Sequence, residues 1–283
     1  MAHKHGVRYK YGVIAPILLG LAFLGLASAP VQAAGNGLKP VRIILVGDST
    51  VALHNGWGPG FCDLMKPEVT CLDVAKNGRS SKSYREEGSW DAVMNELKSN
   101  ASFSATYVLI QFGHNDQPGK PGRSTDLATE FPANMKRYVE DVKSTGAQAV
   151  LVTPLTRRMF QDGKLKNDLV PWADATRKVA QEEGVPVLEL NADSSAAVQK
   201  MGGVEANTLA NAPPPANVQA AAATGTSLAV PKVRPPVNAP RPKTPVPVFD
   251  YTHLGPKGWA YFGRMVANEL VKSVPALAPY VKG

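Results

Sequence analysis

Residues 41–50 read VRIILVGDST, and the rest of the chain is interpreted from this stretch. An apolar, β-branched run of this length predicts a strand from Val41 to Val46 that is buried on both faces. The glycine and aspartate that follow break the strand, so the chain turns and leaves Ser49 at its carboxyl end. Open α/β sheets bind their ligands at this end of their strands. Ser49 can therefore act as a nucleophile if a base reaches it, or it can simply bond the backbone of its own turn.

Strands and helices alternate along the rest of the chain. Further apolar runs predict strands at 70–75, 106–112, 147–152 and 185–190, and amphipathic patterns predict helices at 58–65, 90–97, 131–143, 169–182 and from Pro256 onward. Such alternation is typical of a parallel sheet covered on both faces. We therefore predict a three-layer, flavodoxin-like α/β fold with a five-stranded parallel sheet and right-handed crossovers.

The first 33 residues are laid out as a secretory signal peptide. Lys4, Arg8 and Lys10 precede an apolar run at 13–26, and a small-residue sequence follows at 31–33. The run is short for a membrane span and contains proline and glycine, so we expect cleavage and no stable membrane insertion afterwards. The mature protein is then expected in the periplasm or outside the cell.

Composition restricts the partners and cofactors. The formal net charge is +8, but no long run of lysine and arginine marks a nucleic-acid site. No H-E-x-x-H or C-x-x-C motif supplies zinc ligands, so we expect no metal and no other cofactor. We also expect a monomer. Cys62 falls on the first predicted helix and Cys71 at the start of the next strand. Export favours a disulfide between them, and two buried thiols are the alternative.

One segment departs from the alternation of strands and helices. Residues 204–248 are rich in alanine, proline, valine and asparagine and show neither a helical nor a strand period. This composition predicts a disordered insertion that divides the folded domain into residues 34–203 and 249–283. The insertion is either an inert surface segment, which costs little stability, or a flexible arm that touches polysaccharide.

A candidate base and acid lie just before the last helix, in the sequence DYTH at 250–253. Three-residue spacing can place the Asp250 carboxylate against one imidazole nitrogen of His253. The other nitrogen can then take the proton of Ser49, as in a Ser-His-Asp triad. A helix-capping or core histidine is the alternative for His253.

Polar groups that could hold an oxyanion follow the next two strands. Gly78 follows the second predicted strand and Asn115 the third, and neighbouring parallel strands share one edge of the sheet. The backbone N–H groups of Ser49 and Gly78 and the side-chain amide of Asn115 can together form an oxyanion hole. Taken singly, Gly78 and Asn115 also suit turns. For Asp48 we expect a buried structural role in the turn.

These motifs resemble the blocks of the SGNH, or GDSL-type, hydrolases and occur in family order: GDS at 47–49, Gly78, GHND at 113–116 and DYTHL at 250–254. The resemblance implies a flavodoxin-like fold and the roles given above for serine, glycine, asparagine and histidine. A closer resemblance is to the rhamnogalacturonan acetylesterases. It rests on GDST at 47–50, NGWG at 55–58, GRSS at 78–81 and a Thr-Pro pair followed by two arginines at 157–158.

We therefore predict an exported serine esterase that removes acetyl groups from a polysaccharide, with rhamnogalacturonan or pectin as the first candidate. Arg79 and Arg157, or Arg158, would pair with galacturonate carboxylates. His114 would brace its loop or face the substrate, and Trp57 would stack on a sugar.

Three alternatives remain open at this stage. The same triad serves acyltransferases and broad-specificity lipases or thioesterases, because a fold does not determine the substrate. A non-catalytic wall-binding protein that uses residues 204–248 is the third.

Overall fold

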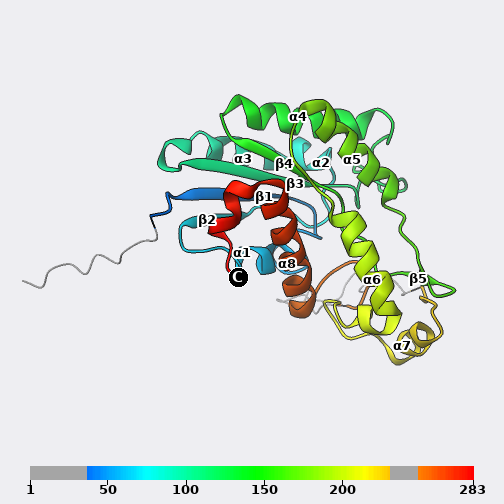
Figure 1. The fold of residues 1–283 in the computed structure, drawn as a ribbon. Helices are drawn as coiled ribbons and strands as arrows, with labels where there is room; N and C mark the ends of the chain where they lie inside the picture. Colours follow the sequence, from blue (N-terminus) through cyan, green and yellow to red (C-terminus); the bar gives the residue numbers. More distant parts are fainter. Residues whose placement is uncertain (1–36, 230–247) are drawn as a thin grey trace, which may run out of the picture. The chain divides into compact units, whose positions relative to one another are not determined.

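The central sheet of the computed structural model, which describes residues 37–229 and 248–283, is parallel and has five strands in the order β2-β1-β3-β4-β7 (Figure 1). The strands are β1 (Val41–Gly47), β2 (Val69–Asp73), β3 (Ala105–Gln111), β4 (Gln148–Val152) and β7 (Val187–Leu188). This is the flavodoxin-like order and confirms the predicted fold. The predicted signal peptide lies outside the described residues.

Helices cover both faces of the sheet. Figure 1 shows α3 (Ser89–Leu97), α4 (Glu130–Ser144) and α5 (Val170–Glu183) on one face, and α1 (Gly58–Cys62) and α8 (Pro256–Ser273) on the other. Side chains of a strand alternate between the faces. Accordingly, Ile43 and Leu45 of β1 belong to the core under α1 and α8, whereas Ile44 and Val46 belong to the core under α3, α4 and α5. All seven residues of β1 are buried, as its sequence predicts.

The remaining elements are short or lie beside the sheet. They are α2 (Ser83–Glu86), the 3₁₀ helices η1 (Asn100–Ser102) and η2 (Pro275–Tyr280), the hairpin strands β5 (Phe160–Gln161) and β6 (Lys164–Leu165), and helices α6 (Leu190–Asn207) and α7 (Ala216–Ala223). No helix within residues 37–229 and 248–283 is long and apolar enough to cross a membrane.

Two predicted elements are shorter than expected. The helix predicted at 58–65 ends at Cys62, because the chain then turns so that Met65 pairs with Val281. The strand predicted at 185–190 is reduced to β7, because Leu190 already begins α6. No amphipathic pattern in the sequence marks α6, and its backbone is non-helical at Gly202.

The prediction that residues 204–248 are disordered is wrong for the part that the structure describes. Helix α6 continues to Asn207, Ala210 pairs with Leu254, and α7 buries Val218 against Phe249 and Tyr251. The physical reason is that the alanine-rich part favours a helix and that its apolar face finds a partner in Phe249 and Tyr251. Residues 230–247 lie outside the described ranges.

A disulfide joins α1 to β2. Cys62 and Cys71 are bonded, with their Cα atoms 5.7 Å apart. The bond links the first helix to the edge strand at the positions expected from the sequence.

Candidate active site

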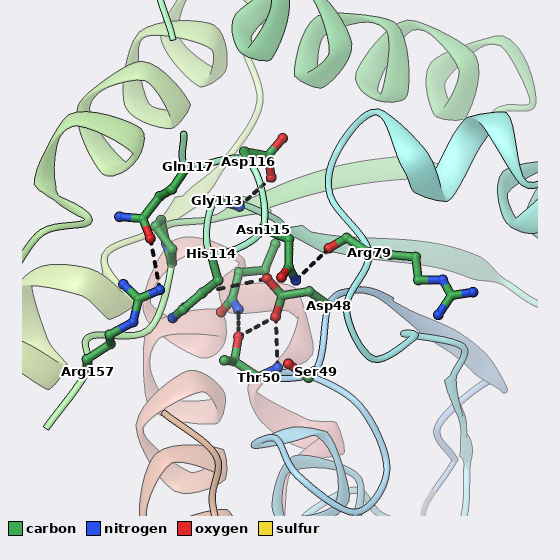
Figure 2. A network of polar contacts seen from close by, with 12 residues as sticks. Asp48, Ser49, Thr50, Arg79, Gly113, His114, Asn115, Asp116, Gln117 and Arg157 are labelled. Carbon is green, nitrogen blue, oxygen red and sulfur yellow. Dashed lines mark hydrogen bonds and ion pairs between the residues drawn. The ribbon is translucent and has the colours of Figure 1, made fainter. Parts of the chain in front are cut away.

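The loop after β1 is held by a chain of buried hydrogen bonds. Asp48 is fully buried, and its Oδ1 accepts from the backbone N–H (2.8 Å) and the hydroxyl (2.7 Å) of Thr50. The Thr50 hydroxyl accepts from Gln111 Nε2 (2.6 Å), and Gln111 Oε1 accepts from Trp57 Nε1 (3.0 Å). Asp48 thus has the structural place expected of it. The hydrogen bonds between Asp48 and Thr50 fix the backbone on both sides of Ser49 (Figure 2).

Trp57 does not have the place predicted for it. Its side chain is 0 % exposed and belongs to the core under α1 and α8, so it cannot stack on a sugar. An indole that buries both its ring and its N–H in this way stabilises the fold. The sequence could not distinguish the two roles, because tryptophan serves both.

The structure brings Ser49, His253 and Asp250 into direct contact. His253 Nδ1 lies 2.6 Å from Asp250 Oδ2, and His253 Nε2 lies 2.8 Å from Ser49 Oγ. The hydrogen-bond network assigns the tautomer. Because a carboxylate only accepts, Nδ1 carries the proton, and Nε2 can accept from the Ser49 hydroxyl. Ser49 is 7 % exposed, so the nucleophile lies at the floor of the site.

Asp250 also shapes its own loop. Its other oxygen, Oδ1, accepts from the backbone N–H groups of Thr252 and His253, both at 2.7 Å. Burial raises the pKa of Asp250, but the hydrogen bonds and the charge of His253 outweigh it and bring this pKa down to about 2. The carboxylate is therefore ionised at neutral pH and can stabilise a positively charged imidazole. The Leu254 N–H donates to Asn55 O (2.7 Å), which links this loop to the nucleophile loop.

Gly78 lies in the loop after β2 and Asn115 in the loop after β3. Gly78 has a φ of +78°, a conformation that glycine adopts without strain. One N–H of the Asn115 amide donates to Arg79 O (3.0 Å), which leaves its second N–H for a ligand. Figure 2 shows this contact beside Asp48 and Ser49.

Arg123 completes this part of the site, and the sequence analysis missed it. Its Nη1 donates to Gly78 O (3.1 Å) and lies 3.5 Å from Asn115 Oδ1. The guanidinium therefore ties together two groups proposed for the oxyanion hole. Arg123 belongs to none of the sequence motifs, so its contact with the site is visible only in the folded chain.

Asp116 is a further link between the same two loops. It accepts from the backbone and hydroxyl of Ser81, from the Gly113 N–H and from the Thr125 hydroxyl. Burial raises the pKa of Asp116 to about 6, although these hydrogen bonds lower it. The last residue of the GHND motif is thus a structural brace.

The predicted substrate residues Arg79 and Arg157 lie at opposite ends of the network in Figure 2. Arg79 Nε donates to Glu87 (2.7 Å). Arg157 donates to Asp168 (2.7 Å) and to Gln117 (2.9 Å). Both guanidinium groups are already paired, so a substrate carboxylate would have to share them.

His114 and Arg158 lie below the surface. His114 is 3 % exposed, with Nδ1 3.6 Å from Asp48 Oδ2, and this favours the bracing role over contact with substrate. Burial lowers the pKa of His114 despite the nearby Asp48 charge, so its imidazole is neutral at pH 7. Arg158 is 0 % exposed and bonds only to the protein backbone, so the prediction that it pairs with galacturonate is wrong.

A shallow pocket of about 310 Å³ lies beside the nucleophile loop. Its lining comes from the loops after β1 and β2: Ala52, Leu53, His54, Ala75, Lys76, Asn77 and Arg79. A larger cavity of about 830 Å³ lies along α1 and α8 and includes no member of the triad. The smaller pocket includes no member of the triad either, but its lining comes from the two loops that carry Ser49 and Gly78, so it is the better candidate for binding the group next to a scissile ester.

The parallel sheet and the serine, histidine and aspartate at its carboxyl edge define a serine-dependent ester hydrolase built on a flavodoxin-like fold. Residues 45–213, more than half of the chain, match the GDSL-like lipase/acylhydrolase family. The chain belongs to this family, and within it to the branch that includes the rhamnogalacturonan acetylesterases.

Two relatives from Bacillus subtilis carry the assignment to the branch. Rhamnogalacturonan acetylesterase RhgT is 34% identical over 179 residues, which are 60% of this chain and 74% of the relative. The probable rhamnogalacturonan acetylesterase YesY is 30% identical over 168 residues, which are 57% of this chain and 75% of the relative.

Solved structures share the fold. The YxiM protein of Bacillus subtilis superimposes with a TM-score of 0.62 at 20% identity, over 86% of this chain and 59% of that chain. A mutant of Axe2, an acetyl-xylooligosaccharide esterase from Geobacillus, has a TM-score of 0.52 at 12% identity, over 82% of this chain and 93% of that chain. At these identities the likeness shows the fold alone.

Proposed function

We propose that this protein is an exported acetylesterase that removes acetyl groups from rhamnogalacturonan. The observation that carries the proposal is the contact of 2.8 Å between Ser49 Oγ and His253 Nε2, with Asp250 2.6 Å behind the imidazole. The names of RhgT and YesY support the acetylated polysaccharide as the substrate.

In the proposed reaction Ser49 Oγ attacks the acetyl carbonyl carbon while His253 Nε2 takes its proton. The Ser49 and Gly78 N–H groups and the free Asn115 N–H stabilise the negative oxygen of the tetrahedral intermediate. The intermediate collapses, and the sugar oxygen leaves with the proton from His253. Water then attacks the acetyl-Ser49 ester with His253 as base, and acetate is released.

The charge of the pocket beside the nucleophile loop supports a uronate at the neighbouring sugar. Lys76 and His54 line it and are exposed, and Arg79 lies at its edge. Within the described residues, no hydrogen bond or ion pair engages the Lys76 ammonium. A free cation in a pocket between the loops that carry Ser49 and Gly78 fits the carboxylate of galacturonate better than a neutral sugar or a lipid chain.

Two features support export to the periplasm or the exterior. The first 33 residues have the layout of a signal peptide. The Cys62–Cys71 disulfide is of the kind that persists in oxidising compartments.

Acetate release from acetylated, rhamnogalacturonan-rich pectin tests the proposal, with wild type beside Ser49→Ala and 4-nitrophenyl acetate as a second substrate. We expect wild type to release acetate from the polymer and the variant to release none. Cleavage of the small ester alone would preserve the serine mechanism and reject the polymer. If folded protein cleaves neither, acyl transfer or non-catalytic wall binding replaces the proposal.

A further inference from the structure

One buried arginine binds every carbonyl of the segment that carries the acid and the base. The Arg158 backbone N–H donates to Tyr251 O (2.8 Å). Its Nη2 donates to Asp250 O and His253 O, both at 2.9 Å, and its Nη1 donates to Thr252 O (3.2 Å). Four consecutive carbonyls, 250–253, are therefore held by a single residue about ninety positions earlier in the chain.

In the part of the chain that the structure describes, Arg158 is a buried charge without a carboxylate partner. Its side chain is 0 % exposed, and within the described residues no carboxylate lies within ion-pair distance of it. Buried charges are normally paired, because removing them from water is costly. Here backbone carbonyl dipoles take the place of a counter-ion. Burial lowers the pKa of Arg158 to about 10, and the Asp250 charge opposes this, so the guanidinium remains protonated at neutral pH.

The other contacts of the segment are directed elsewhere. The N–H groups of Thr252 and His253 are taken by Asp250 Oδ1. Leu254 is held by Asn55 and by Trp259, whose Nε1 donates to Leu254 O (2.8 Å). The Asn211 N–H also donates to His253 O, at 3.3 Å, whereas for the carbonyls of Asp250, Tyr251 and Thr252 the described residues supply no donor other than Arg158.

We propose that Arg158 is a positioning residue, whose planar guanidinium sets the acid–base segment 250–253 at the distance from which His253 reaches Ser49. This inference rests on the proposed function and adds a residue that touches no substrate. The planar fork is essential to it, since Nη2 donates to the carbonyls of Asp250 and His253 while Nη1 donates to that of Thr252. A lysine ammonium carries its charge on a single nitrogen and cannot donate to all three of these carbonyl groups.

Kinetics of Arg158→Ala with 4-nitrophenyl acetate test the inference. A displacement of about 1 Å in a catalytic group can lower the rate about 10²-fold, so we expect that loss in kcat. KM should change less than about threefold, because Arg158 does not contact the substrate. Guanidinium chloride below its denaturing range should restore part of kcat by filling the vacated space, and equal sodium chloride should not.

Arg42→Ala is the matched control. Arg42 is also a buried arginine, 1 % exposed, but it lies at the amino end of β1 and pairs with Glu96 (2.9 Å). We expect this variant to lose stability and keep the kcat of wild type once compared at equal folded fraction. Equal kcat losses in both variants, or no rescue specific to Arg158→Ala, would overturn the inference.

Arg158→Lys keeps the test decisive if the alanine variant fails to fold. It retains the charge, and we expect a folded protein whose kcat is at least about tenfold lower with unchanged KM. Wild-type kcat in Arg158→Lys, or failure of both variants to fold, would overturn the positioning role. Wild type and Ser49→Ala are assayed in parallel; absence of Ser49-dependent activity in wild type would reject the proposed function itself, and this inference with it.

Discussion

Replacing Asp250 by asparagine tests the proposed triad at its most constrained contact. Asp250 Oδ1 accepts from two backbone N–H groups at 2.7 Å. Asparagine keeps both hydrogen bonds only if its carbonyl oxygen takes the place of Oδ1. Its NH₂ group then faces His253 Nδ1, where Oδ2 now lies at 2.6 Å.

This orientation forces the imidazole into the wrong tautomer. An NH₂ group donates, so His253 Nδ1 must accept and the ring proton must move to Nε2. Nε2 then presents a proton to Ser49 and cannot take one from it. The same exchange in a Ser-His-Asp triad lowers kcat about 10⁴-fold. We expect a loss of this size, equivalent to about 5 kcal/mol of activation free energy.

The assay is the steady-state hydrolysis of 4-nitrophenyl acetate at neutral pH. Asp126→Asn is the control, because Asp126 Oδ1 also accepts from the backbone N–H groups two and three residues later, at 3.0 and 2.8 Å, away from the triad. We expect wild-type kcat in this control. If Asp250→Asn retained more than about a tenth of wild-type kcat, the tautomer argument and the role of Asp250 would be refuted.

Three further predictions concern substrate, pH and stability. Lys76→Gln should raise KM for acetylated pectin about tenfold, because it removes the partner of the substrate carboxylate, and should leave KM for 4-nitrophenyl acetate unchanged. Lys178→Gln on α5 is the control. An equal change in KM for both esters would contradict binding of a uronate in the pocket that Lys76 lines. Burial raises the pKa of Asp73 to about 7, so the folded chain binds an extra proton there, and the Asp73 contribution to stability should fall by at most about 4 kcal/mol as pH rises from about 4 to about 7. Urea unfolding at both ends of that range should show this slope reduced in Asp73→Asn, and equal slopes would argue against a buried proton. The Cys62–Cys71 bond closes a loop with a separation of 9 residues, so replacing both cysteines by serine should lower the free energy of unfolding by about 2–3 kcal/mol; a loss well under about 1 kcal/mol would show that the loop is already ordered in the unfolded chain.

The segment 204–229 shows where composition is an incomplete guide. Proline and alanine together indicated disorder, yet the alanine-rich part forms α7 and Tyr251 donates to Leu228 O (3.0 Å). The reason is that ordering depends on whether an apolar face finds a partner. Val218 finds one in Phe249 and Tyr251, which lie some thirty residues further along the chain.

The sequence by itself determined the alternation of strands and helices, the parallel sheet and the positions of Ser49, Asp250 and His253. These follow from local periodicity and from the rule that the carboxyl ends of parallel strands meet at one edge. Only the tertiary structure decided which side chains support them. Arg158 and Arg123 donate hydrogen bonds to backbone carbonyls distant in the chain. A bond to a carbonyl depends on where the backbone runs and not on the type of residue that carries it, so no sequence pattern records it.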